Sequence, residues 1–162
     1  MTNRIQIAMN AVNPTRASWI EVSEQALRNN IAQLRSYLSP GCRLMAVVKA
    51  NGYGHGAINI APILVDAGAS YLAVATLGEA IELRQSGLAA PILVLGYTPP
   101  WLAQSATQNN IALTLFDVET ASQYESAARQ SNRHLTVHVK VNTGMNRLGV
   151  VPSEAASLFQ QL

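Results

Sequence analysis

The sequence predicts an α/β fold, an incomplete (β/α)8 barrel of the TIM type in which about five of the eight βα units are present. Five nearly continuous apolar segments recur about every 20 to 26 residues, and each is followed by a segment with helical spacing of its apolar residues. Strands that alternate with helices form parallel βαβ units, and strands buried on both faces are apolar throughout. The five segments are residues 44–48, 71–75, 91–95, 111–116 and 135–141.

The region before these strands is predicted to begin the fold. Residues 1–16 read as a polar leader, and the SWIEV segment at 18–22 is predicted to be a short strand. Ser23 can then cap a helix, because its side-chain oxygen can accept a hydrogen bond from the first turn. The apolar side of that helix recurs at Leu27, Ile31, Leu34 and Leu38.

Helix start and stop signals lie between the strands. Thr76 and Glu79 have the spacing of a capping box, and Gly87 fits the position after the last turn of that helix. Asp117 can cap a helix that follows the fourth strand. The expected helices of the barrel units cover residues 60–68, 79–87, 101–108, 118–130 and 154–162.

Two architectures fit this alternation, an open doubly wound sheet and part of a barrel. The Gly-x-Gly-x-x-Gly turn of dinucleotide-binding sheets does not follow the first strand. The last strand, LTVHVKV, alternates, so that its valines share one face while His138, Lys140 and Asn142 share the other. Valines toward helices and polar residues toward a lumen favour the barrel.

A barrel of five strands would leave its sheet edges and its lumen open. The last helix is amphipathic and is cut short at Leu162. We therefore expect residues 17–162 to be the N-terminal part of a β/α barrel, either as a piece of a longer protein or as a subunit completed by another chain.

Composition restricts the classes of function. With 49% hydrophobic and 12% charged residues, the 162-residue chain can bury a core. Its net charge of +2 is scattered, so neither nucleic acid nor a membrane surface is expected as a partner. Cys42 is the single cysteine and cannot form an internal disulfide, and no apolar run is long enough to span a bilayer. We expect a cytoplasmic protein, without a metal site.

Lysine is scarce, because nine of the eleven basic residues are arginines and only Lys49 and Lys140 are lysines. Lys49 ends the first barrel strand, and the carboxyl ends of the strands are where β/α barrels place their active sites. An amine there can form a Schiff base with an aldehyde. The glycine-rich loop after it can approach an anion, to which Tyr53 offers a hydroxyl. The alternative is a solvated lysine before a flexible turn.

The three histidines have simpler interpretations. His55 is expected to hydrogen-bond its own loop, and His134 to face solvent in a turn. His138 is expected to be a core histidine on the inner face of its strand rather than a catalyst.

Two motifs resemble the pyridoxal phosphate-dependent alanine racemase family, of fold type III. AVVKANGYGHG, at 46–56, closely resembles the family's cofactor-lysine signature, and HVKVNTGMNRLG, at 138–149, resembles its HLK-x-DTGMGRLG element. Weaker likeness in SWIEVSEQALRNNIAQLR, ATLGEAIELRQSG and PILVLGY extends the resemblance from about Ala17 to Val151 in the family's order.

The resemblance implies a role for four residues. Lys49 matches the lysine that holds the cofactor as an internal aldimine and then acts as a base on one face of the substrate Cα. Tyr53 matches a phosphate-binding tyrosine. Arg147 matches the arginine near the cofactor's phenolic oxygen and the substrate carboxylate. Lys140 matches a lysine that is often carbamylated and holds that arginine in place, which would turn a repulsion between two cations into an attraction.

The same resemblance implies that the full-length protein interconverts L-alanine and D-alanine and supplies D-alanine for peptidoglycan. It also implies a homodimer, a second base from the partner's β-rich C-terminal domain, and little activity or cofactor affinity in the 162-residue chain alone. Asn142 and Asn146 depart from the family's aspartate and glycine, which weakens the expectation of a carbamylated Lys140. The alternatives are a non-catalytic pyridoxal phosphate-binding homeostasis protein and a cofactor-free half-barrel.

Overall fold

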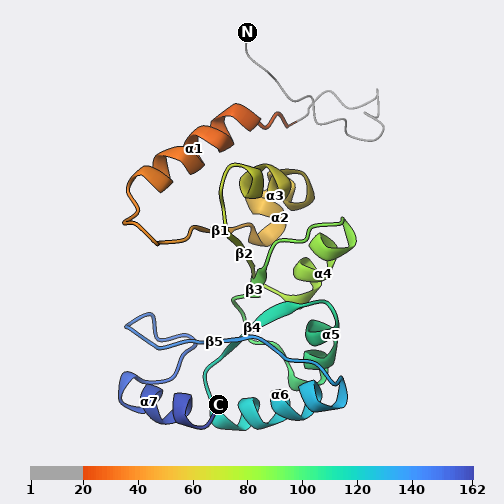
Figure 1. The fold of residues 1–162 in the computed structure, drawn as a ribbon, viewed down its shortest axis with the longest axis vertical. Helices are drawn as coiled ribbons and strands as arrows, with labels where there is room; N and C mark the ends of the chain where they lie inside the picture. Colours follow the sequence, from red (N-terminus) through yellow and green to blue (C-terminus); the bar gives the residue numbers. More distant parts are fainter. Residues whose placement is uncertain (1–19) are drawn as a thin grey trace.

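The computed structural model describes residues 20–162, in which five strands alternate with helices (Figure 1). The polar leader predicted at 1–16 and the start of the strand predicted at 18–22 lie outside this range. The strands are β1 (Met45–Val47), β2 (Tyr71–Val74), β3 (Ile92–Val94), β4 (Ile111–Leu115) and β5 (Val137–Val139). The helices are α1 (Glu24–Ser36), α2 (Lys49–Tyr53), α3 (Ala57–Asp66), α4 (Leu77–Gln85), the 3-10 helix η1 (Pro100–Leu102), α5 (Ala103–Gln108), α6 (Val118–Gln130) and α7 (Pro152–Gln160).

All five strands form one parallel sheet in chain order, β1-β2-β3-β4-β5. A doubly wound sheet reverses its strand order at a switch point, whereas a barrel adds each new strand beside the one before it. The unbroken order therefore confirms the predicted incomplete barrel and excludes the doubly wound alternative for the described residues.

The two faces of the sheet have different surroundings. Side chains that belong to the helix-covered core include Leu72, Val74 and Leu113, each with essentially no exposed surface. On the other face the rings of Tyr71 in β2 and His138 in β5 meet edge to face, with centroids 5.7 Å apart. Because two strands lie between β2 and β5, this contact requires a curved sheet. The polar face of β5 thus turns to the lumen, as the alternation predicted.

The predicted caps form where the sequence placed them. The Ser23 side chain accepts a hydrogen bond from the backbone of Ala26, and Asp117 accepts one from Thr120. The capping box at the start of α4 is complete, with both reciprocal hydrogen bonds present.

The prediction of a strand at 18–22 is wrong for its described part, since residues 20–22 have no strand partner. Ile20 is 75% exposed, while Val22 packs against the core. The apolar face predicted for the next helix is also only partly buried: Ile31 is covered, but Leu34 and Leu38 are exposed. One face of this helix packs on α3. The helix ends at Ser36, so Leu38 lies beyond it.

At the amino-terminal end of the sheet, Arg84 links the loops that precede β3 and β4. Its guanidinium donates to four backbone carbonyls in two loops, and this burial lowers the pKa of Arg84. The acceptors are the carbonyl oxygens of Leu88, Ala90, Asn109 and Asn110, at 2.7 to 2.9 Å.

Among the described residues, every helix is too short or too polar to pass through a lipid bilayer.

Candidate active site

The two lysines follow the carboxyl ends of β1 and β5. The parallel ladder continues for one residue past each strand, through hydrogen bonds from Val48 N to Ala73 O and from Lys140 N to Leu115 O, both 2.8 Å. Since carboxyl ends of parallel strands share one end of a sheet, Lys49 and Lys140 leave the barrel on the same side. β1 and β5 are the opposite edges of the described sheet, so the two lysines are not on neighbouring strands.

Lys49 opens a turn of left-handed backbone. Ala50, Asn51, Gly52 and Tyr53 have φ values of 51°, 53°, 64° and 55°, so α2 is a left-handed turn rather than an ordinary α-helix. Each non-glycine residue in this conformation costs roughly 1–2 kcal/mol. Such strain persists only where surrounding contacts determine the conformation, and it is concentrated at functional sites.

Side chains of the loop hold part of this turn. The Asn51 Oδ1 accepts a hydrogen bond from Ala57 N at 2.8 Å, and His55 Nδ1 lies 2.9 Å from Gly52 O, as predicted for His55. Gly52 is buried, and a Cβ added there would lie 2.7 Å from Ile60 Cδ1. Its positive φ and the close approach of Ile60 Cδ1 both favour glycine at this position.

A residue outside the loop completes the arrangement. The Glu79 carboxylate, in the first turn of α4, accepts hydrogen bonds from Ala50 N at 2.6 Å, from Ala75 N at 2.7 Å and from Thr76 N at 3.2 Å. The sequence pattern predicted Glu79 only as part of a capping box. Its hydrogen bond to the residue after Lys49 spans 29 positions, which no local pattern signals.

The other predicted site residues lie at the same end of the sheet. Tyr53 is 59% exposed in the turn that begins with Lys49. Arg147 is exposed in the loop after β5, where its Nη2 lies 3.7 Å from the Met145 sulfur. Asn142 holds that loop: its Oδ1 accepts from the backbone of Gly144 and Asn146.

The structure therefore unites Lys49 with Tyr53 in one turn and places Lys140 and Arg147 at the two sides of another loop. Lys49 and Lys140 are each partly buried, whereas Tyr53 and Arg147 are exposed. An amine and a phenol thus share the turn after β1, and a guanidinium lies in the loop after β5, at the same end of the sheet.

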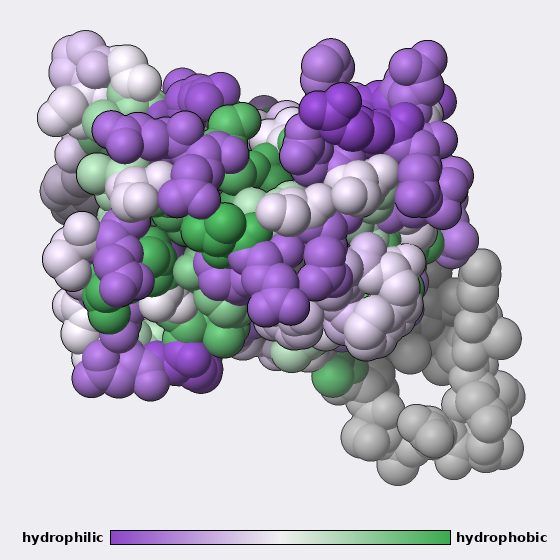
Figure 2. All heavy atoms as spheres, turned by 90° about the horizontal axis from the view of Figure 1, so that it is seen from below, coloured by the Kyte–Doolittle hydropathy of each residue, from purple (hydrophilic) through white to green (hydrophobic). Residues whose placement is uncertain are grey.

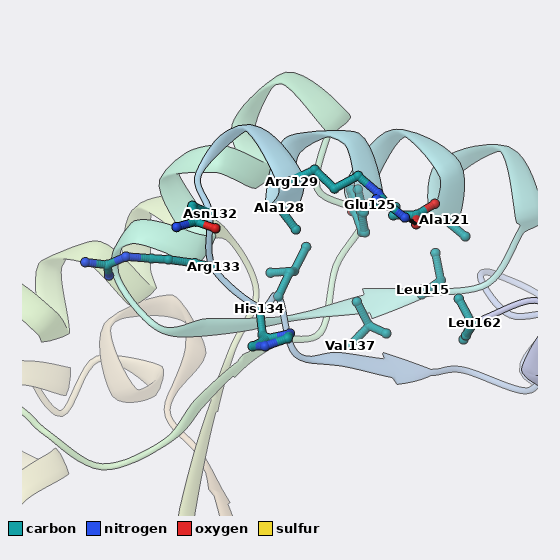
Figure 3. A pocket seen from close by; sticks show the side chains of 12 residues that line it. Leu115, Ala121, Glu125, Ala128, Arg129, Asn132, Arg133, His134, Val137 and Leu162 are labelled. Atoms are coloured by element: carbon teal, nitrogen blue, oxygen red, sulfur yellow. Dashed lines mark hydrogen bonds and ion pairs between the residues drawn. The ribbon is translucent and has the colours of Figure 1, made fainter.

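A separate cavity of about 690 Å³ opens on the helix-covered side of the sheet. Figure 3 shows Leu115, Val137 and Leu162 beneath α6, with the ion pair of Arg129 and Glu125, 2.6 Å long, above them. Seen from the α6 and α7 end, apolar side chains gather between polar ones (Figure 2). This cavity lies behind the sheet rather than at the ends of the strands, so it is not part of the Lys49 site.

The chain is similar in sequence to a known protein family. Residues 22–162 match the family described as "Alanine racemase, N-terminal domain". Alanine racemase 1 of Oceanobacillus iheyensis is 44% identical over 143 residues, which are 88% of this chain and 38% of that protein. The chain thus spans a little over a third of the length of that relative.

Solved structures are similar over the same region. An alanine racemase from Clostridium difficile 630 superposes with a TM-score of 0.78 at 37% identity, over 85% of this chain and 36% of that one. A histidine racemase from Leuconostoc mesenteroides superposes with a TM-score of 0.79 at 32% identity, over 85% of this chain and 37% of its own. Proteins named for two different substrates therefore share this part of the fold.

Proposed function

We propose that this chain, which belongs to the alanine racemase family by its N-terminal domain, carries the lysine-bearing part of an enzyme that interconverts L-alanine and D-alanine. One observation carries the proposal: Lys49 follows the end of the first strand of a barrel-type sheet and opens a strained left-handed turn at the mouth of the barrel. Strain of this kind at a strand end that also carries a primary amine is expected of a reactive site, not of a solvated lysine.

The residues present fit pyridoxal phosphate. Lys49 provides the amine for its aldehyde, the Tyr53 hydroxyl can donate to a phosphate oxygen, and Arg147 can lie near its phenolic oxygen. When bound, the cofactor supplies an electron sink for the charge that remains when a substrate Cα loses its proton.

The remaining work belongs to side chains of the protein. Lys49 Nζ, at the mouth of the lumen, would take the proton from Cα on one face and return it. The Arg147 guanidinium would hold the substrate carboxylate by paired hydrogen bonds. Lys140 would hold Arg147 in place, most effectively if carbamylated, because the modified side chain carries a negative charge.

Full racemisation needs a second base on the opposite face of Cα. We propose that it comes from a β-rich C-terminal domain of a partner subunit in a homodimer, so that residues 17–162 form one part of a larger site. The product would be D-alanine for peptidoglycan. A cytoplasmic location stays a prediction.

The experiment joins this chain to the C-terminal part of the Oceanobacillus iheyensis relative and measures D-alanine formed from L-alanine by chiral chromatography. We expect turnover in the joined protein and a loss of at least ~1000-fold in Lys49→Ala and in Lys49→Arg, which keeps the charge but not the reactive amine. The Arg129→Gln variant is the matched control, because it removes a positive charge from the exposed ion pair on α6, outside the proposed site, and should leave turnover unchanged.

The alternatives predict different outcomes. Covalent binding of cofactor at Lys49 without any D-alanine would support a non-catalytic cofactor-binding protein. Absence of cofactor at Lys49 would support a half-barrel that binds none, and would refute the proposed function.

A further inference from the structure

We propose that Glu79 is the positioning residue for Lys49: its carboxylate joins the ends of β1 and β2 and thereby fixes the direction in which Lys49 leaves the barrel. The inference rests on the proposed function only in taking Lys49 as the reactive amine. The clamp itself is defined by three hydrogen bonds, from Ala50 N to Oε1 and from Ala75 N and Thr76 N to Oε2.

The chemistry of the clamp requires a carboxylate. Both oxygens of Glu79 accept, one from each strand end, and a carboxylate carries no donor. In glutamine, one oxygen would become an NH₂ group facing a backbone N–H, so that one of the two strand ends would lose its acceptor. An aspartate would be one methylene shorter and could serve its own helix cap without reaching Ala50.

The position of the clamp explains why it would act on Lys49. Ala50 is the first residue of this turn with positive φ, and it directly follows Lys49. A left-handed alanine is disfavoured unless its peptide is held. Without the Glu79 hydrogen bond, this peptide can rotate toward the ordinary helical region, which would turn the Lys49 side chain away from its present direction.

The carboxylate is itself held on a rigid element. Thr76 Oγ1 accepts from Glu79 N at 3.3 Å, which closes the capping box. The same helix packs against the sheet through three buried side chains, those of Leu77, Ala80 and Leu83. The N-terminus of a helix also favours a negative charge. Glu79 is thus anchored through β2 and α4, and not through the loop that it holds.

The first measurement is hydrogen exchange of backbone amides by NMR, in the complete 162-residue chain. In Glu79→Gln we expect the Ala50 amide to exchange about tenfold faster or more, since a hydrogen bond to a charged group is lost. Glu79→Asp should have the same effect at Ala50 while retaining protection at Thr76. Thr76→Ala, which weakens the helix cap but keeps the carboxylate, should leave Ala50 unchanged.

The second measurement uses the two lysines of the chain as probe and internal reference. The joined protein, with the C-terminal part of the Oceanobacillus iheyensis relative, is treated with pyridoxal phosphate, whose aldehyde carbon forms a C=N bond to a lysine nitrogen with loss of water. Borohydride then donates hydride to that carbon, and peptide mass spectrometry gives the label at Lys49 relative to Lys140. We expect Lys49 to be favoured in the wild type and the ratio to fall several-fold in Glu79→Gln and Glu79→Asp, but not in Thr76→Ala or in Glu82→Gln on the same helix.

The outcomes separate the two proposals. A joined wild-type protein that does not favour Lys49 would refute the proposed function, whatever Glu79 does. A Lys49 preference that survives in Glu79→Gln, or that Thr76→Ala abolishes equally, would overturn the clamp. Should Glu79→Gln fail to give a folded circular dichroism spectrum, Glu79→Asp decides the question by the same ratio.

Discussion

The loop after β1 and the loop after β5 leave the same end of the sheet and carry the residues proposed for the site, yet they are held in different ways. The first is left-handed from Ala50 onward and is tied to α4 by Glu79, 29 residues further along the chain. The second is tied within itself, because Asn142 bonds the backbone and side chain of Asn146, four residues away.

The difference teaches how rigidity is distributed at the mouth of the barrel. A loop anchored to a buried helix keeps its geometry only while that helix is in place, whereas a loop that closes on itself can move as a unit. We therefore expect the Lys49 turn to be the fixed part of the site and the Arg147 loop to be the adjustable part.

The largest expected effect lies where the second loop returns to the sheet, at Gly149. Its φ is 134°, and a Cβ there would lie 2.7 Å from Asn142 N and 3.0 Å from Val141 C. Gly149→Ala should therefore destabilise the protein by about 3 kcal/mol, because backbone atoms rather than a flexible side chain must move. Urea unfolding followed by circular dichroism measures the change.

Gly144→Ala is the matched control for that substitution. Gly144 has a φ of 122°, but a Cβ there would meet no atom within 4 Å. It should show only the conformational part of the cost, about 1–2 kcal/mol. Equal effects at Gly144 and Gly149 would mean that the return of the loop to Val141 is not tightly packed.

The elements of the barrel could be predicted because each has a local cause. Apolar runs marked the five strands, and Ser23, Thr76 and Asp117 marked helix starts that the structure confirms. The strand predicted around Ile20 failed for a physical reason. A strand needs a neighbour to pair with, and an apolar pattern cannot show whether one exists.

The site was less predictable than the fold. The motif pointed to Lys49 and its glycines, but left-handed Ala50 and Tyr53 contradict the local preferences of those residues, whereas Asn51 tolerates this conformation. The Ala50 amide is held by Glu79, which is distant in sequence. Local rules therefore predicted a flexible loop where long-range hydrogen bonds produce a defined one.

An intermediate effect on the free energy of unfolding is expected for Tyr124, whose uncharged side chain also joins a helix to a segment that follows a strand. The Tyr124 hydroxyl, on α6, donates to Thr98 O at 2.6 Å in the segment after β3, and burial raises the pKa of Tyr124 to about 12. In the unfolded chain a tyrosine loses its proton near pH 10. Between these values the folded state binds more protons, so the free energy of unfolding should fall by about 2 kcal/mol as the pH rises from 10 to 12.

Tyr124→Phe isolates this contribution. It should cost about 1 kcal/mol at neutral pH, where the Thr98 carbonyl loses its donor, and should flatten the pH dependence between 10 and 12. Tyr71, whose pKa is also raised by burial, is present in both proteins and cancels in the comparison. An unchanged pH profile would show that the Tyr124 hydroxyl is accessible to water. The hydrogen bond from Tyr124 to Thr98 O would then hold the segment after β3 without being buried.

The smallest effect is expected at Asn142, because its hydrogen bonds stay within one exposed loop. Asn142→Ala removes the acceptor for Gly144 N and Asn146 N, and we expect a loss of about 1 kcal/mol or less, with faster exchange of those two amides. Asn142→Asp keeps the acceptor and should retain their protection. The comparison of the loops adds a second expectation: exchange at Ala50 should not change in either variant. Faster exchange at Ala50 in Asn142→Ala would show that the two loops are coupled across the mouth of the barrel, and that the Arg147 loop helps to hold the Lys49 turn.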